Sequence, residues 1–276
     1  MERHLKEFNS NEEYEDYMEE HEIEGPYVFY MKDSHVIYSG IEKIKLVDMG
    51  LPSGTLWAAE PMKNENGDVL YFAWGETSGY TAEQVGVDRY FYSTDYKFYS
   101  NGNYTKYNDT DGLHELEAED DAATQILGAD YQIPSVGHWC ELLENCYINF
   151  ICLDDGNDNS YDDSYFELES KINGNKIILN QYSCLDGGYI MEPAYYYSGF
   201  YFQTNTKRDV SSLYVYIQFY CSGEHVYPFD YCTDNSINND CGISIQHGTS
   251  RINGVCIYPI KKGSYIPEEP QLPVAK

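Results

Sequence analysis

Cysteine and histidine are the residues of this chain best able to do covalent or metal chemistry, and their spacing favours neither. The eight cysteines lie at positions 140, 146, 152, 184, 221, 232, 241 and 256, with irregular gaps and no C-x-x-C pair. A cysteine nucleophile needs a base beside it, and His225 and His247 stand in no recognisable arrangement with any thiol. We therefore expect reduced thiols, several of them small core residues, with no catalytic residue and no metal site.

Carboxylates are abundant, with 46 Asp+Glu against 17 Lys+Arg and a net charge of -29. Neighbouring carboxylates arise by chance in such a chain, so they do not indicate a glycosidase. Asp154–Asp163 is rich in the oxygen ligands that calcium prefers, but Gly156 comes too early for an EF-hand loop. We interpret this segment as a solvated acidic turn and predict no cofactor. The charge disfavours nucleic acid and anionic membranes as partners.

Tyrosine is the other unusual feature, with 30 residues that become denser in the C-terminal half. In Leu213–Phe219 the strict alternation puts Tyr214, Tyr216 and Gln218 on one face and the apolar residues on the other. Tyrosine mixed with Ser, Gly and Asn resembles the composition of antibody binding loops. The alternative, that many of these rings only cap a small core, stays open. Our candidate ligand-binding residues are Tyr201, Tyr214, Tyr216, Gln218, Tyr220, Tyr227, Asp230, Tyr231 and Asn235.

Short strands separated by Gly, Asn and Asp must position these residues. The expected strands are 44–49, 55–58, 69–74, 176–179, 199–203, 213–219, 242–246 and 255–260. One helix is expected from about 117 to 127, ending at Gly128, and a second after Pro134 with Ser135 as its N-cap. The second helix would bury Trp139, Leu142, Leu143 and Cys146, and we expect Trp57 and Trp74 in the core rather than in a sugar platform. Helices outside βαβ alternation predict an α+β fold with mainly antiparallel pairing.

Three further stretches shape the predicted organisation. A capping box at Ser10 opens an amphipathic helix over 11–21, and a hairpin of 26–31 and 35–38 follows. Residues 75–113 form a long segment without regular structure, typical of a functional or packed insertion. Pro267, Pro270 and Pro273 share one edge of a polyproline II helix. We divide the chain into a helix–hairpin unit at 1–40, a domain at 41–263 and a tail at 264–276.

Four ordered motifs resemble the Fibrobacter succinogenes major paralogous domain family over residues 44–262. They are VDMGLPSGTLWA at Val47–Ala58, YFAWGET at Tyr71–Thr77, EDDAA at Glu119–Ala123 followed by QIPSVGHWCELLENC at Gln132–Cys146, and RINGVCIYP at Arg251–Pro259. The resemblance implies a C-type-lectin-like domain related to the formylglycine-generating-enzyme fold. The chain departs from the family at His138, which replaces a capping glutamate, so we expect the capping box to be lost. It also carries Tyr258 before Pro259 where the family has arginine.

The opening LKEFNSNEEYEDY at Leu5–Tyr17, with the hairpin after it, is similar to N-terminal segments of structural proteins of crAss-like and related Bacteroidales phages. The first residues contain no apolar signal-peptide core, and no apolar run is long enough for a transmembrane helix. We therefore expect a non-enzymatic virion protein made in the host cytoplasm. Its partners would be other virion proteins through residues 1–40 and a host-surface glycan or protein, and a homo-oligomer, a trimer by analogy, is expected.

Several alternatives remain open. A formylglycine-generating-type enzyme would use a cysteine pair near the C-terminus, but no two cysteines here align with that motif. A bacterial surface adhesin and a purely structural head or tail decoration are the others. Residues 220–241 also resemble, in composition, the variable patch of C-type-lectin-like proteins that retroelements diversify.

Overall fold

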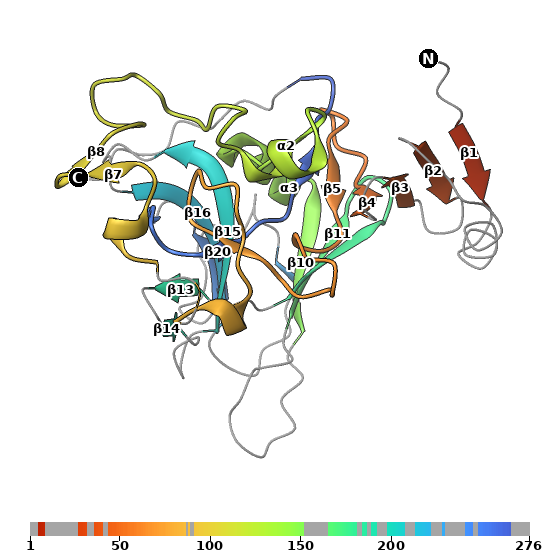
Figure 1. The fold of residues 1–276 in the computed structure, drawn as a ribbon. Helices are drawn as coiled ribbons and strands as arrows, with labels where there is room; N and C mark the ends of the chain where they lie inside the picture. The colour runs from red at the N-terminus through yellow and green to blue at the C-terminus, as the bar shows by residue number, and fades with distance from the viewer. Residues whose placement is uncertain are drawn as a thin grey trace.

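The computed structural model describes residues 5–8, 27–31, 36–40, 44–86, 88, 91–151, 165–180, 184–186, 189–191, 198–207, 213–221, 228–229, 241–244 and 248–265. The predicted α+β class is confirmed: short, mostly antiparallel strands are accompanied by two α-helices among these residues (Figure 1). The helices are α2 (Ala122–Leu127) and α3 (Val136–Glu144), with 3-10 turns η1 (Ala82–Gln84) and η2 (Ser93–Asp95). None of the described helices is long and apolar enough to cross a membrane.

The largest sheet has seven strands in the order β1-β2-β3-β4-β5-β21-β9. Their bounds are β1 (Leu5–Phe8), β2 (Tyr27–Met31), β3 (Val36–Gly40), β4 (Ile44–Asp48), β5 (Leu56–Ala58), β21 (Ile260–Lys261) and β9 (Tyr131–Gln132). The predicted hairpin is present as β2 and β3, and β3 pairs with β4, so the hairpin belongs to the same sheet as β4 and β5. Strand β1 runs parallel to β2. The helix predicted at 11–21 lies outside the described residues.

Two further four-stranded sheets and three strand pairs lie within the described part of the chain. The first sheet joins β12 (Lys176–Asn180), β11 (Tyr165–Ser170), β10 (Cys146–Ile151) and β17 (Pro228–Phe229). The second joins β15 (Ser198–Lys207), β16 (Leu213–Cys221) and β18 (Cys241–Ser244), with β19 (Gly248–Ser250) also on β16. The pairs are β13 (Cys184–Asp186) with β14 (Tyr189–Met191), β20 (Val255–Cys256) with β6 (Tyr71–Phe72), and β7 (Tyr99–Ser100) with β8 (Asn103–Tyr104).

Helix α3 forms as its sequence predicts, with one correction at its first turn. Ser135 caps it, and Trp139, Leu142 and Leu143 are buried on its core side. The capping box is not lost: His138 Nδ1 accepts the backbone N–H of Ser135 at 3.2 Å. An imidazole nitrogen thus replaces the glutamate oxygen that this position usually supplies. Cys146 is buried too, but it belongs to β10 and not to the helix.

Three predicted elements differ most from their expected bounds. Helix α2 begins at Ala122, because Asp121 accepts the N–H of Thr124 as its N-cap, and residues 117–121 form only a turn. The strand expected at 69–74 is reduced to β6. The N–H of Trp74 donates to the carbonyl of Arg251 and does not extend the strand pairing. The strand expected at 255–260 divides into β20 and β21, because Pro259 has no N–H to donate where the chain moves from β6 to β5.

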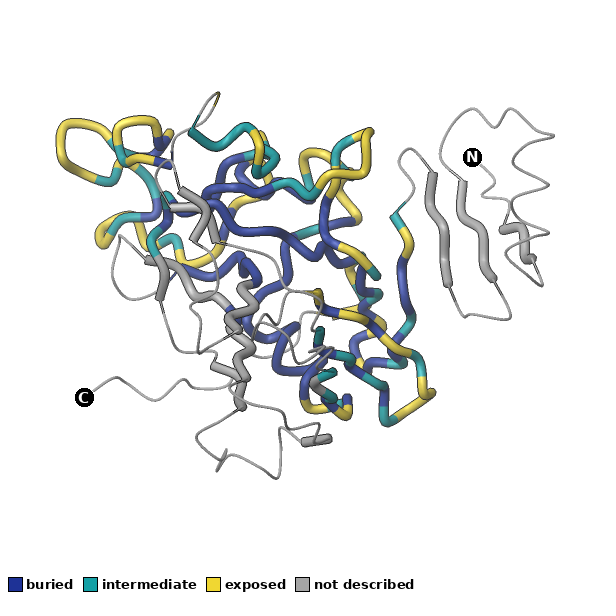
Figure 2. Tube along the Cα trace, turned by 90° about the horizontal axis from the view of Figure 1, so that it is seen from below, coloured by how far each residue is buried: buried dark blue, intermediate teal, exposed yellow. Residues whose placement is uncertain are grey.

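The core lies where the motif segments meet, and the exposed residues gather in peripheral loops (Figure 2). Trp57, Trp74 and Trp139 are each fully buried, which confirms the predicted core role of all three. The segment 75–113 is not an open loop: Phe91, Tyr96, Phe98 and Tyr107 are buried against this core. It is a packed insertion, one of the two alternatives that its length allowed.

Candidate functional site

The backbone places five of the nine candidate ligand-binding residues on two neighbouring strands. Tyr201 lies on β15 opposite Gln218 of β16, and the register sets Gly199 opposite Tyr220. Tyr214 and Tyr216 lie on the same β16 strand. The other four, Tyr227, Asp230, Tyr231 and Asn235, lie outside the described residues.

Strand β15 is covered on both faces along Phe202–Lys207. On one face Phe202 stacks on Trp139, with ring centroids 5.5 Å apart. On the other face Gln203 donates from Nε2 to the Phe72 carbonyl at 2.9 Å. Phe72 belongs to β6, and Gln203 is the register partner of Tyr216. Strand β6 therefore covers this face of the sheet next to the position of Tyr216. On β16, Ile217 is fully buried, as predicted for the apolar side of this strand.

The segment between β16 and β18 reaches the first sheet through β17. Phe229 pairs with Ile148 of β10, and Pro228 pairs with Asn149. Tyr227 and Asp230 directly flank β17 in the sequence, and β17 pairs with the edge of β10. This contact joins the tyrosine-rich segment to a surface that the sequence prediction did not include.

That surface is the outer face of β10, β11 and β12. The inner face buries alternate residues such as Ile148, Phe166 and Leu168, so their neighbours must face outward. Tyr147 is 49% exposed and Ile178 is 41% exposed. The register places Tyr147 beside Glu169, Asn149 beside Glu167 and Ile151 beside Tyr165. We call this set the outer face: Tyr147, Asn149, Ile151, Tyr165, Glu167, Glu169, Lys176, Ile178 and Asn180.

The charges of the outer face are partly compensated. The Lys176 ammonium contacts Glu167 at 2.8 Å and Glu169 at 3.1 Å. Lys171 lies 5.4 Å from the ring centre of Tyr147. What remains is a sheet surface with aromatic rings, amides and carboxylates, which can stack on a flat ligand and hydrogen-bond its hydroxyl groups. A usable sequence pattern existed, since Tyr165–Ser170 alternates polar and apolar residues.

A buried arginine organises the opposite side of the domain. Arg251 is fully buried, and its guanidinium donates to the carbonyls of Tyr107 and Lys106, each at 3.0 Å. Its Nε donates to the Tyr96 hydroxyl, which itself donates to the Trp74 carbonyl. Five aromatic rings surround the guanidinium, at 4.7 to 5.8 Å from their centres: Trp74, Tyr96, Phe98, Tyr104 and Tyr107. This arginine fixes the insertion 75–113 to the C-terminal motif.

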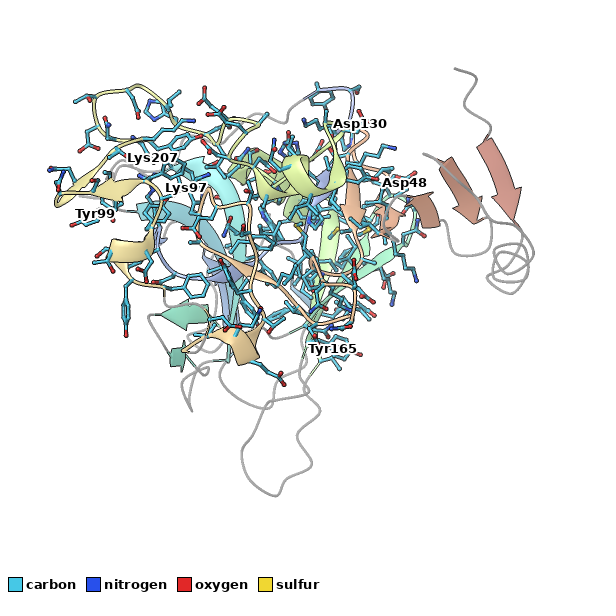
Figure 3. The ribbon with its side chains drawn as sticks, in the orientation of Figure 1. Asp48, Lys97, Tyr99, Asp130, Tyr165 and Lys207 are labelled. Atoms are coloured by element: carbon cyan, nitrogen blue, oxygen red, sulfur yellow. The ribbon has the colours of Figure 1, made fainter. Side chains whose placement is uncertain are left out.

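An ion network next to this arginine is centred on Asp120. Its carboxylate accepts from Lys97 at 2.7 Å, from Lys106 at 2.6 Å and from the Tyr107 hydroxyl at 2.7 Å. Burial alone would raise the pKa of Asp120, but these donors outweigh it and lower the pKa. Figure 3 shows Lys97 together with Lys207 on the side of Tyr99, far from Tyr165 of the outer face.

Lys106 already lies within the acidic group that accompanies this network. Glu117, Glu119 and Asp120 have carboxylate oxygens within 4.8 Å of one another. The ammonium of Lys106 contacts all three, at 2.6 to 2.7 Å. The lysine already supplies the positive charge that a metal ion would bring. The acidic turn predicted at 154–163 lies outside the described residues.

The cysteines whose side chains the structure describes are poorly suited to nucleophilic catalysis. Cys140, Cys146 and Cys256 are buried thiols that form no disulfide, as predicted. Burial raises the pKa of the Cys146 thiol to about 12, so its thiolate is scarce at neutral pH. Burial also lowers the pKa of His138 to about 4, and its Nδ1 is occupied by the helix cap. These groups are parts of the core rather than of a reaction centre.

A groove of about 520 Å³ lies between the start of β4, the turn after β5 and the end of α2. Ile44, Met62, Leu70 and Ile126 contribute to its walls, and none of the candidate ligand-binding residues does. Comparison with protein-family models, with curated proteins and with solved structures gives no match to this chain. We therefore infer the function from the geometry described above.

Proposed function

We propose that this protein is a non-enzymatic component of a bacteriophage virion that displays a C-type-lectin-like domain and binds a glycan of the host surface. One observation carries the proposal. Five chemically capable residues of the motifs, Trp57, Trp139, His138, Cys146 and Arg251, are buried in the frame of the domain. This burial supports a recognition role for surfaces between the motifs.

The recognition surface that we propose has two parts. The first is the outer face, where Tyr147 and Tyr165 supply rings and Asn149 supplies an amide. The second is the segment 220–241, with Tyr220, Tyr227, Asp230, Tyr231 and Asn235, which joins the β10 edge through β17. Tyrosine rings stack on the C–H faces of sugars, and amides and carboxylates bind sugar hydroxyl groups, so this composition suits a carbohydrate.

The overall charge narrows the class of glycan. A chain with a net charge of -29 repels uronic acids, sialic acids and phosphorylated sugars at long range. We therefore propose a neutral or amino-sugar polysaccharide as the ligand.

Attachment to the particle would use residues 1–40. Among the described strands, β1 is the outermost of the large sheet, and its outer edge is where a strand of another virion protein would pair. Homo-oligomerisation, with a trimer as the analogous state, would multiply weak glycan contacts into firm attachment.

The test is binding of the purified full-length chain to a panel of neutral, amino-sugar and acidic polysaccharides from Bacteroidales surfaces. Saturable binding to a neutral or amino-sugar member is the expected result. A folded chain that binds no member of the panel would leave decoration of the head or tail as the better account. Mass spectrometry of purified particles then gives its copy number, which is high for a decoration and low for a receptor-binding tip.

The competing function is an enzyme of the formylglycine-generating type, and the reactivity of the cysteines can test between the two. An enzyme needs a reactive thiol, and burial disfavours reaction at Cys140, Cys146 and Cys256, three of the eight cysteines. Titration of the native chain with a thiol reagent across pH separates the two accounts. A thiol that reacts with a pKa below 7, or stoichiometric copper, would favour the enzyme. A bacterial surface adhesin of the same fold would bind glycan but be absent from phage particles.

A further inference from the structure

Four asparagines of this chain are followed directly by glycine, and they lie in different surroundings. Glycine has no side chain to hinder an attack by its backbone nitrogen on the preceding side-chain amide. An asparagine before glycine is therefore prone to deamidation, in which the amide becomes a carboxylic acid. The sequence ranks the four pairs equally, so their surroundings must separate them. The pairs are Asn66 with Gly67, Asn101 with Gly102, Asn173 with Gly174, and Asn253 with Gly254.

Two of these pairs are exposed, but hydrogen bonds hold their reacting groups. The N–H of Gly67 donates to the Asn64 carbonyl at 3.0 Å, and the N–H of Gly174 donates to the Ser170 carbonyl at 3.0 Å. The side-chain amide of Asn173 is also engaged, because its nitrogen donates to one backbone carbonyl and its oxygen accepts one backbone N–H. These bonds must break before the glycine nitrogen can reach the amide carbon.

The pair at Asn253 is enclosed in the core. Asn253 and Gly254 are both buried. A Cβ placed on Gly254 would lie 2.5 Å from the ring of Phe91, so the ring packs directly against this backbone. The packing opposes the rotation that the reaction needs and keeps water away from the product.

The pair at Asn101 lacks both kinds of protection. Asn101 and Gly102 are exposed and form the turn between β7 and β8, with φ of 51° and 81° (Figure 1). Among the described residues, none accepts the N–H of Gly102, and a Cβ placed there would meet nothing within 4 Å. The hairpin has only two paired residues on each strand, so opening it costs little free energy.

We propose that Asn101 is the deamidation site of the native chain and is converted there to aspartate and isoaspartate. The Gly102 nitrogen gives up its proton and bonds to Cγ of Asn101. The bond from Cγ to Nδ2 breaks, and the amide leaves as ammonia with that proton. Water then opens the cyclic imide at Cγ to give aspartate, or at the main-chain carbonyl to give isoaspartate, and the glycine nitrogen regains a proton.

The isoaspartate product would disturb the hairpin and the buried arginine beneath it. It adds a methylene to the main chain inside a two-residue turn, whose register pairs Ser100 with Asn103. The ring centre of Tyr104, the next residue of β8, lies 4.9 Å from the guanidinium of Arg251. Tyr99 of this hairpin lies far from Tyr165 of the outer face (Figure 3). The modification is therefore independent of the proposed glycan binding.

Peptide mass spectrometry of the full-length native chain tests the site. The chain is incubated at mildly alkaline pH in water enriched in heavy oxygen, which labels each new carboxylic acid. We expect Asn101 to convert about fivefold faster than Asn66 or Asn173, the ratio expected from the loss of one hydrogen bond. Asn253 should convert most slowly. An equal or faster rate at any of the other three asparagines would overturn the proposal.

Two controls separate the effect of the fold from that of the sequence. In urea all four asparagines should convert at similar rates, and a lead of Asn101 that persists there would contradict the structural cause. In the native chain, Oδ1 of Asn64 accepts the N–H groups of Asn66 and Asp68, and Asn64→Ala removes both bonds. Conversion of Asn66 should then rise toward the rate of Asn101. An unchanged Asn66 rate would contradict the protection that we assign to hydrogen bonds.

Discussion

The frame around α3 and Arg251 and the proposed recognition surface at the β10 edge contain similar residues in opposite environments. In the frame, rings such as those of Trp139 and Tyr107 are fully buried, and polar groups such as the Arg251 guanidinium have hydrogen-bond partners. At the outer face Tyr147 stays half exposed on a strand whose other side is core. In this chain, an exposed aromatic residue is therefore a candidate for recognition only where the opposite face of its strand is buried in the core.

The largest expected difference between the two regions is in stability. Replacing Trp139 by alanine removes a fully buried ring that packs on Trp57 and Phe202, and should lower the free energy of unfolding by about 3 to 5 kcal/mol. Replacing Tyr147 by alanine should change it by less than about 1 kcal/mol. Denaturant unfolding of both variants measures this. Equal losses would show that the outer face is also part of the frame.

The pH dependence of stability offers a second test of the frame. The pKa of His138 is about 4 in the folded chain against about 6.5 when unfolded, because burial opposes its charge. The unfolded chain therefore binds the proton more readily between these values, and stability falls as pH drops from about 6.5 to 4. His138 would contribute up to about 3 kcal/mol to this loss.

The matched variant is His138→Gln, which keeps a side-chain acceptor at the capping position but does not titrate. Unfolding curves at pH 7 and pH 4.5 should show a smaller pH-dependent loss for the variant than for the native chain. The same loss in both chains would mean that His138 is not held neutral by burial.

Substitution of Arg251 tests whether its buried charge contributes to the stability of the frame and not to recognition. Lysine keeps the charge but cannot donate to the carbonyls of Lys106 and Tyr107 in a fork, so Arg251→Lys should cost about 2 kcal/mol of stability. Glycan affinity of the folded variant should stay unchanged. A variant of normal stability that has lost binding would place Arg251 in recognition.

Salt should have the smallest effect. A neutral glycan interacts only weakly with the net charge of the chain, so its affinity should change less than about twofold between 0.05 and 0.5 M salt. An acidic polysaccharide should bind better as salt rises, because screening weakens its repulsion from the acidic chain. Titrations at the two salt concentrations measure both trends. Strong binding of acidic glycans at low salt would contradict the ligand class that we propose.

The sequence predicts the frame better than the surface, for a physical reason. Helix α3 and its Ser135 cap follow from local spacing, and the three tryptophans follow from the apolar character of their elements. The burial of Arg251 could not be predicted, because arginine is normally exposed and the rings that surround it come from a segment more than a hundred residues away. Long-range pairing of this kind leaves no local pattern.

The candidate site was predicted only in part. The alternation of Leu213–Phe219 placed Ile217 in the core, and β15 and β16 extend beyond the predicted strands. The sequence does not reveal the outer face, because β10 follows α3 directly and the helical spacing of apolar residues continues to Cys146. The contact of β17 with β10 depends on two residues and has no period from which it could be predicted.

The most direct test of the division between frame and recognition surface is glycan affinity measured on a double variant of the outer face. Tyr147→Ala/Tyr165→Ala should weaken binding at least tenfold while the unfolding midpoint stays within a few degrees of the native value. Tyr92→Ala is the matched control, because Tyr92 is 46% exposed, close to the 49% of Tyr147, but lies next to η2. Native affinity in the double variant, or an equal loss in Tyr92→Ala, would contradict the account.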